Sequence, residues 1–192
     1  NFLSKFKILD NLRRSLLELF IIILIFITVG SGKKKLWTVV FLTIVVIYPF
    51  LLEMLNLAFS RKEGEKKQKT FTPHIDGFKG AFYRAILTVG CLPYKAYVEL
   101  TSICKTIYRL TISHKHFLEW MTSEEADKQS KTSLSNYYKM MAVNVILGAI
   151  LIVFSAISVT LNKNDITFSW QIYNWLLTII GILWIITPYI MY

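Results

Sequence analysis

Cysteines, histidines and carboxylates are the residue types in this chain that could carry chemistry. Cys91 and Cys104 occur in the same central segment as three histidines, so a metal site is conceivable; the histidines are His74, His114 and His116. No closely spaced Cys-x-x-Cys or His-x-x-x-His pair supports such a site. The sequence also lacks a Ser-His-Asp or Cys-His constellation and a Gly-rich phosphate loop. We therefore expect no catalytic residue and no metal ligand in this chain.

Two carboxylates, Glu18 and Glu53, lie next to long apolar segments, an unusual position for a charged side chain. An ionisable residue in or near a membrane span is a functional candidate by default, because burying its charge in hydrocarbon is costly. Glu53 lies close to the end of its segment, where it can reach the lipid headgroups, and Glu18 lies near the start of another apolar segment. Solvation at the membrane interface is the simpler explanation, and a functional role stays open.

Four apolar segments dominate the chain and must position everything else. They are Leu12–Val29, Leu36–Leu55, Ala142–Leu161 and Phe168–Tyr192, and each approaches the length of about 17–25 residues that crosses a bilayer. Of the 192 residues, 54% are hydrophobic, and the mean hydropathy is +0.48. A soluble domain of this size would bury only part of such a surface. We predict an all-α integral membrane fold with about four transmembrane helices.

The positive charges predict how these spans are oriented. Lys and Arg number four in the start of the chain through Arg14 and fourteen in the segment 56–141, but only three in loop 30–35 and one in the last loop. The positive-inside rule therefore places both termini and the long middle segment in the cytoplasm. The two cysteines would then be free thiols, because that compartment is reducing. The net charge of +10 is explained by topology, so we expect no nucleic-acid partner.

The middle of the chain divides into a linker and an interfacial layer. The approach helix and the first two spans occupy residues 1–59, and a polar, charge-rich linker follows over 60–73. The interfacial helices occupy 74–140, and the last two spans occupy 141–192. Two amphipathic helices flank Pro93, each with an apolar stripe at helical spacing. The stripes are Phe78, Phe82, Ala85, Val89 and Leu92 in the first, and Tyr97, Leu100, Cys104, Ile107 and Thr111 in the second. We expect both helices to lie on the inner leaflet or to pack under the bundle.

Three further patterns predict local structure. Residues 2–15 read as an amphipathic helix that approaches the first span. A capping box at Thr122–Glu125 predicts that a helix begins there. Small residues in the third span would let helices approach closely, and these are Gly148, Ala149, Ser155 and Ala156.

Several segments of the chain resemble the cyclic β-1,2-glucan synthase family. They are Lys5–Leu16, Ala81–Ala85, Tyr108–Leu110, His116–Trp120 (continued by Thr122, Glu125 and Ala126) and Tyr138–Met140. Their order and spacing agree over most of residues 5–141, and the first and fourth are the most specific. The chain departs from the family at Leu17 and Glu18, where members have a proline nearby, and at His114 and Lys115, where they favour Arg-Arg.

The resemblance implies a large inner-membrane glycosyltransferase. Members polymerise glucose from UDP-glucose through β-1,2 links, using a GT-A-type domain with a DxD metal motif and a QxxRW acceptor motif. Separate glycoside-processing domains control length and close the ring. Neither motif occurs here, so UDP-glucose and a divalent metal would bind in a transferase domain outside this chain, and we expect no cofactor in the chain itself. The chain would be the membrane part that follows that domain, and its lack of an initial Met suggests a piece of a longer protein.

We therefore expect residues 1–192 to form a single membrane domain that anchors and orients the transferase domain in the bacterial inner membrane. Interfacial side chains could contact the glucan chain, and the candidates are Trp120, Glu119, His116 and Arg84. Sugar faces stack on aromatic rings, which makes Trp120 the best of these. Structural packing and phospholipid headgroups explain the same residues as well, so both explanations stay open.

A non-enzymatic membrane protein is the alternative: a scaffold, or a subunit of a transporter or channel. It would explain Pro49, Glu53 and the small residues as parts of a conducting path. Against it, none of the four segments carries a charge near its middle.

Overall fold

Every regular element in the described part of the chain is a helix, which confirms the predicted all-α class. The computed structural model describes residues 2–30, 35–59, 72–114, 133–161 and 168–192. The elements are α1 (Phe2–Ser15), α2 (Leu17–Gly30), α3 (Lys35–Phe59), α4 (Thr72–Gly90), α5 (Leu92–Tyr108), a π-helical turn (Arg109–Ser113), α7 (Leu134–Met140), α8 (Ala142–Leu161) and α9 (Phe168–Met191). Most of the predicted linker and the capping box at Thr122 lie outside these residues.

Three helices, α3, α8 and α9, are long and apolar enough to cross a membrane. Their spanning segments are Leu36–Leu55, Ala142–Thr160 and Phe168–Met191, close to three of the four predicted spans. The remaining prediction, Leu12–Val29, corresponds to a shorter apolar helix over Leu17–Val29. At about 1.5 Å per residue this helix is about 20 Å long, below the roughly 30 Å of a hydrocarbon core.

The end of α1 explains why that predicted span is shortened. Arg13 and Arg14 form its last turn, and both guanidinium groups pair with the carboxylate of Asp10, at 2.8 and 2.7 Å. These charged groups keep the last turn of α1 polar, so the apolar helix begins only at Leu17. The backbone N–H groups of Leu16 and Phe20 still bond the carbonyls four residues earlier, so the chain continues through the junction without unwinding.

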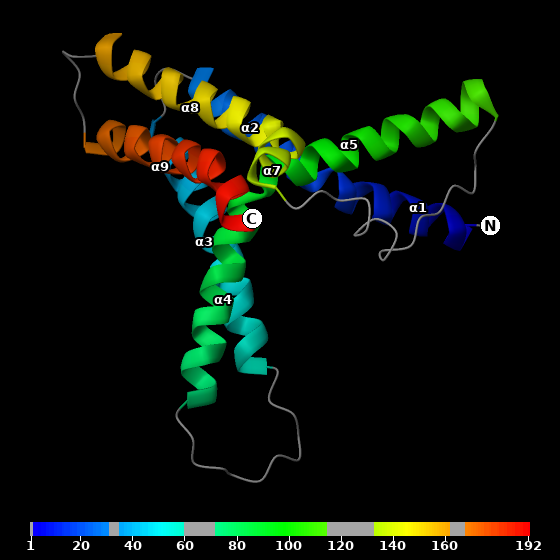
Figure 1. Cartoon of the computed structure of the whole chain (residues 1–192), viewed down its shortest axis with the longest axis horizontal. Coiled ribbons are helices and arrows are strands. Elements are labelled where there is room, and N and C mark those ends of the chain that lie inside the picture. Colours follow the sequence, from blue (N-terminus) through cyan, green and yellow to red (C-terminus); the bar gives the residue numbers. More distant parts are fainter. Residues whose placement is uncertain (1, 31–34, 60–71, 115–132, 162–167) are drawn as a thin grey trace.

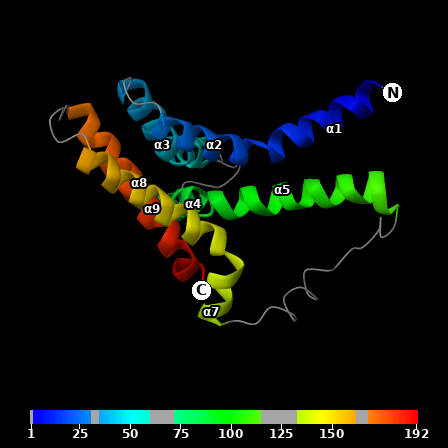
Figure 2. The same ribbon diagram turned by 90° about the horizontal axis from the view of Figure 1, so that it is seen from above.

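The helices radiate from one centre in three groups (Figures 1 and 2). Helices α8 and α9 form a hairpin, which makes the most extensive helix pair of the described residues. Helix α3 packs against both α4 and α9, and α4 follows the second half of α3 away from the centre. Helices α1 and α5 extend together in a third direction, and α2 packs on α5 near the centre.

Close backbone approach holds the α8–α9 hairpin together. Gly148 and Gly181 face each other, and a Cβ added at Gly148 would lie 2.6 Å from the Gly181 carbonyl oxygen. The hydroxyl group of Ser155 donates a hydrogen bond to the Asn174 carbonyl at 3.1 Å, so this buried polar side chain of α8 has a partner on α9. The predicted role of small residues is thus confirmed for Gly148 and Ser155, which are buried, but not for Ala149 and Ala156, which are exposed.

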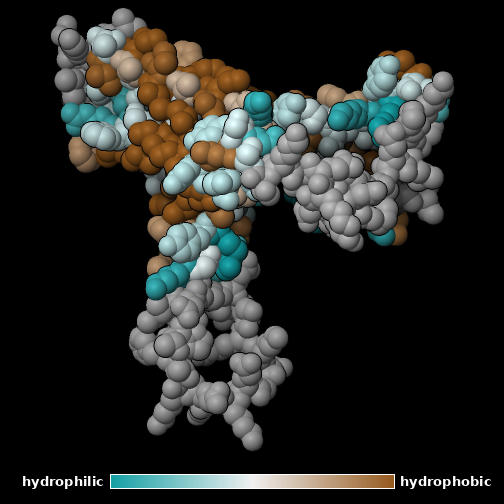
Figure 3. All heavy atoms as spheres, in the orientation of Figure 1, coloured by the Kyte–Doolittle hydropathy of each residue, from teal (hydrophilic) through white to brown (hydrophobic). Residues whose placement is uncertain are grey.

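Much of the apolar surface remains uncovered by protein. Only 6% of the α3 span is buried, compared with 39% of the α9 span. Figure 3 shows hydrophobic residues covering the region of α8 and α9, while hydrophilic residues gather along the α5 arm. Apolar side chains exposed on helices of this length need lipid around them. The fold is therefore that of an integral membrane domain.

The two predicted amphipathic stripes behave differently. In α4, Ala85 and Val89 are buried against the spans, whereas Phe78 and Phe82 are half-exposed and make edge-on contacts with Phe50 of α3. In α5 the whole predicted stripe is exposed, and the buried residues near its start lie on another face. Of the two predicted arrangements, packing of this stripe under the bundle is therefore excluded, and a position on the inner leaflet stays a prediction. The buried residues of α5 are Leu92, Pro93 and Ala96.

Candidate functional site

A sharp elbow between α4 and α5 positions the side chains of the candidate site. Pro93 lies in the first turn of α5, and a proline has no N–H with which to bond the carbonyl four residues earlier, that of Val89. The indole Nε1 of Trp184 in α9 donates to this carbonyl oxygen at 3.0 Å. Asn144 of α8 donates its Nδ2 to the next carbonyl, that of Gly90, at 2.8 Å. The α8–α9 hairpin therefore satisfies the backbone acceptors that the elbow exposes.

Gly90 is the residue that lets the elbow sit so close to α9. A Cβ at this position would lie 2.5 Å from the Thr187 hydroxyl oxygen, a distance that no ordinary contact permits. The elbow residues Val89, Gly90, Cys91, Leu92 and Pro93 are all buried. This rigid, buried turn directs Thr88, Leu92 and Lys95 toward a pocket on the opposite side.

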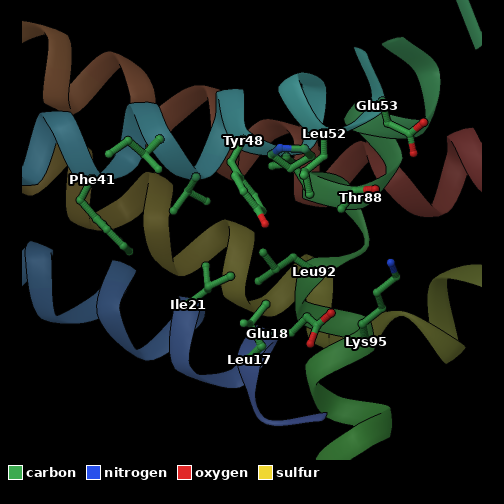
Figure 4. A pocket seen from close by; sticks show the side chains of 14 residues that line it. Leu17, Glu18, Ile21, Phe41, Tyr48, Leu52, Glu53, Thr88, Leu92 and Lys95 are labelled. Atoms are coloured by element: carbon green, nitrogen blue, oxygen red, sulfur yellow. The ribbon is translucent and has the colours of Figure 1, made fainter. Parts of the chain in front are cut away.

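The pocket lies between α2, α3 and the elbow and has a volume of about 340 Å³ (Figure 4). Helix α3 forms one wall, α2 forms the facing wall, and the elbow closes one end. Its apolar lining comes from Leu17, Ile21, Phe41, Ile44, Val45, Tyr48, Pro49, Leu52, Val89 and Leu92. Its polar lining comes from Glu18, Glu53, Thr88 and Lys95, which lie near the elbow, while Phe41 lies at the far end.

A pair of carboxyl groups stands beside this polar end. Glu18, in the first turn of α2, hydrogen-bonds with Glu99 of α5. Burial raises the pKa of Glu99 above its ordinary value, and the charge of Glu18 and their hydrogen bond raise it further, against an opposing effect of Lys95. Oε2 of each glutamate is buried and has no hydrogen-bond partner among the described residues. Glu99 therefore holds a proton more readily than an ordinary glutamate does.

The other acidic residue of the pocket is already paired. Glu53 of α3 accepts a hydrogen bond from Nε of Arg84 in α4 at 2.9 Å, and this ion pair connects the two helices at the rim. Arg84 is thus the one predicted glucan-contact residue whose surroundings the structure describes, and it is more than half exposed. The other three candidates, His116, Glu119 and Trp120, lie outside the described residues.

Neither cysteine belongs to a catalytic or metal centre formed by the described residues. Both are free thiols, Cys91 buried in the elbow and Cys104 exposed on α5. Burial raises the pKa of the Cys91 thiol, which disfavours the reactive thiolate. In the part of the chain that the structure describes, no three His, Cys, Asp or Glu side chains gather as a metal site would require.

The sequence pointed to Glu18 and Glu53 as candidates, but it did not predict which residues lie next to them. Lys95 and Glu99 were not singled out, because they lie outside the apolar stripe of their helix. Their spacing of four residues does put them on one helix face, which was the available signal. The contact of this face with α2 could not be predicted from the sequence, because it depends on the direction in which α5 leaves the elbow.

The fold and the pocket define the class of this protein: an all-helical, multi-pass membrane domain with a laterally placed amphipathic pocket. The chain is similar to part of the cyclic beta-(1,2)-glucan synthase NdvB of Rhizobium meliloti (strain 1021), with 22% identity over 161 residues. The match covers 82% of this chain and only 6% of that protein. No protein-family model matches the chain, and no solved structure matches it significantly. The chain is thus a distant relative of one region of a much larger synthase.

Proposed function

We propose that this chain is the membrane-embedded part of a processive glucosyltransferase that makes cyclic β-1,2-glucan from UDP-glucose. The single observation that supports this most is the similarity to NdvB, which extends over 82% of the chain but concerns only 6% of the relative. A helical membrane domain is the kind of element that a small segment of a large synthase would contribute. In this proposal the chain anchors and orients the transferase domain, and its parent protein lies in the bacterial inner membrane.

The sugar nucleotide and its divalent metal belong to the transferase domain in this proposal. Glycoside-processing domains of the same polypeptide and the growing glucan chain are the other proposed partners. Lys and Arg are abundant in the chain through Arg14 and between residues 56 and 141, which supports a cytoplasmic location for both termini. This location requires that the shorter helix α2 cross the membrane together with α3, α8 and α9.

A transporter or channel subunit gains less support from the structure. Buried polar side chains of the spans, such as Asn144 and Ser155, donate to backbone carbonyls of neighbouring helices. They act as contacts between helices, which is a usual role of polar residues in membrane bundles. The non-enzymatic scaffold remains compatible with these contacts, so an activity measurement must separate it from the synthase.

The test uses the family-like segment His116–Trp120 in the full-length protein. We expect Trp120→Ala to lower glucan synthesis from UDP-glucose in isolated membranes, with an unchanged amount of protein in those membranes. Trp175→Ala is the matched control, because Trp175 on α9 is 69% exposed and therefore contributes little packing. Unchanged synthesis by the Trp120→Ala protein would remove this segment from the proposed function, and a parallel loss of protein and activity would assign Trp120 a structural role.

A further inference from the structure

The pocket beside α3 has the shape of a site for one lipid chain. Its wall on α3 runs from Phe41 to Leu52, a length of about 16 Å at about 1.5 Å per residue. Half of a hydrocarbon core of roughly 30 Å is about 15 Å, the depth of one leaflet. Ile44 and Tyr48 line the pocket and are more than half exposed, so the pocket opens sideways from a helix that is itself a candidate span. A lipid could enter from the bilayer without crossing water.

The charged groups of the pocket lie together at one end and have both signs. The ammonium group of Lys95 lies at the elbow end of the pocket (Figure 4), and no salt bridge to Lys95 occurs among the described residues. Glu18 lines the same end of the pocket, so a carboxyl group and an ammonium group meet there. A headgroup suited to this end therefore carries an anion for Lys95 and an N–H donor for the Glu18 carboxylate.

We propose that this pocket binds an aminophospholipid, with one acyl chain along α3, the phosphate on Lys95 and the primary ammonium on Glu18. A choline headgroup has no N–H to donate to the Glu18 carboxylate. A glycerol headgroup with a net negative charge would meet Glu18 unfavourably. Phosphatidylethanolamine suits both groups, because its phosphate accepts a hydrogen bond from Lys95 and its ammonium donates one to the carboxylate. This proposal is independent of glucan synthesis and concerns only the membrane region.

The test measures equilibrium binding of radiolabelled dioleoyl phosphatidylethanolamine to the purified full-length protein in detergent. The phosphatidylcholine and phosphatidylglycerol with the same acyl chains are measured in parallel. We expect phosphatidylethanolamine to bind most tightly, and Glu18→Gln to weaken its binding about tenfold or more, the effect of losing one hydrogen bond to a charged group. Asp10→Asn is the matched control, because Asp10 lies on α1 outside the pocket lining.

A second pair of variants tests the acyl-chain part of the site. Ile44→Trp fills the pocket from a half-exposed position and should abolish tight binding, whereas Ile157→Trp, at a similarly exposed position of α8, should leave it unchanged. Equal affinities for the three lipids, or equal affinity of the Glu18→Gln and unaltered proteins for phosphatidylethanolamine, would overturn the proposal. Tightest binding of phosphatidylglycerol would instead assign the pocket to anionic lipids.

Discussion

At the scale of single residues, Pro93 creates the need for a hydrogen-bond donor from another helix. By removing one amide hydrogen it leaves the Val89 carbonyl without a helical partner, and the indole of Trp184 provides the missing donor from another helix. Trp184 is fully buried, so its N–H has to find such a partner. The break in α4–α5 was predicted from Pro93, but the tryptophan that satisfies it was not, since its partner lies 95 residues away.

The first prediction concerns this hydrogen bond. Trp184→Phe keeps most of the apolar ring but leaves the buried Val89 carbonyl unsatisfied, which should cost about 1–3 kcal/mol. The apparent melting temperature of the protein in detergent should fall accordingly. Trp175→Phe removes an indole that is 69% exposed and should leave the melting temperature unchanged. A Trp184→Phe protein as stable as the parent would mean that the elbow does not need this donor.

The second prediction concerns the proton held by Glu99. Because its pKa is raised in the folded protein, the folded state binds more protons than the unfolded state, so this group stabilises the fold as pH falls from the raised pKa toward the ordinary value near 4.5. Glu99→Gln mimics the protonated form and should raise the melting temperature at pH 8, with a difference that shrinks toward pH 4.5. A difference that does not change with pH would contradict a raised pKa.

The control for the second prediction is a carboxyl group with the opposite shift. Asp10 has its pKa lowered by the hydrogen bond from Arg13 and by Arg14, so its charged form is the favoured one in the fold. Asp10→Asn should therefore not raise the melting temperature at pH 8. Any loss should be small, because Asp10 and its partners are on the surface.

At the scale of elements, two glycines set the distance between α8 and α9. Gly148→Ala would place a Cβ 2.6 Å from the Gly181 carbonyl oxygen, which is backbone and cannot move aside. Overpacking of this kind costs about 1–3 kcal/mol, so we expect a clearly lower melting temperature in detergent. Gly80→Ala is the matched control on α4, because its Cβ would meet only the flexible end of Arg84 at 3.3 Å. Equal stability of the two variants would argue against close α8–α9 packing.

The elements themselves were largely predictable, and their contacts were not. Length and hydropathy predicted α3, α8 and α9 within a few residues, because a membrane span is a local property of the chain. The stripe on α5 was predicted to face either the inner leaflet or the bundle, because an apolar face can be covered by lipid or by protein. The structure leaves this stripe uncovered by protein. The residues of the Glu53–Arg84 and Glu18–Glu99 pairs lie at least 31 positions apart in the sequence, so helical periodicity could not predict these contacts.

At the scale of the whole molecule, the charge distribution predicts the orientation in the membrane. Single cysteines at Gly32 and Asn164, in a protein with Cys91→Ala and Cys104→Ser, should react with an impermeant thiol reagent on intact cells. A cysteine at Gly64 should react only after the membrane is opened. Labelling of the Gly64 position alone on intact cells would reverse the proposed orientation.

One measurement tests most directly whether the chain is the membrane part of a β-1,2-glucan synthase. Membranes that contain the full-length protein are incubated with labelled UDP-glucose and a divalent metal, and the linkage of the product is determined. We predict a β-1,2-linked glucan that is absent from matched membranes without the protein. Membranes in which the protein is present and intact but no β-1,2-linked product forms would contradict the proposed function.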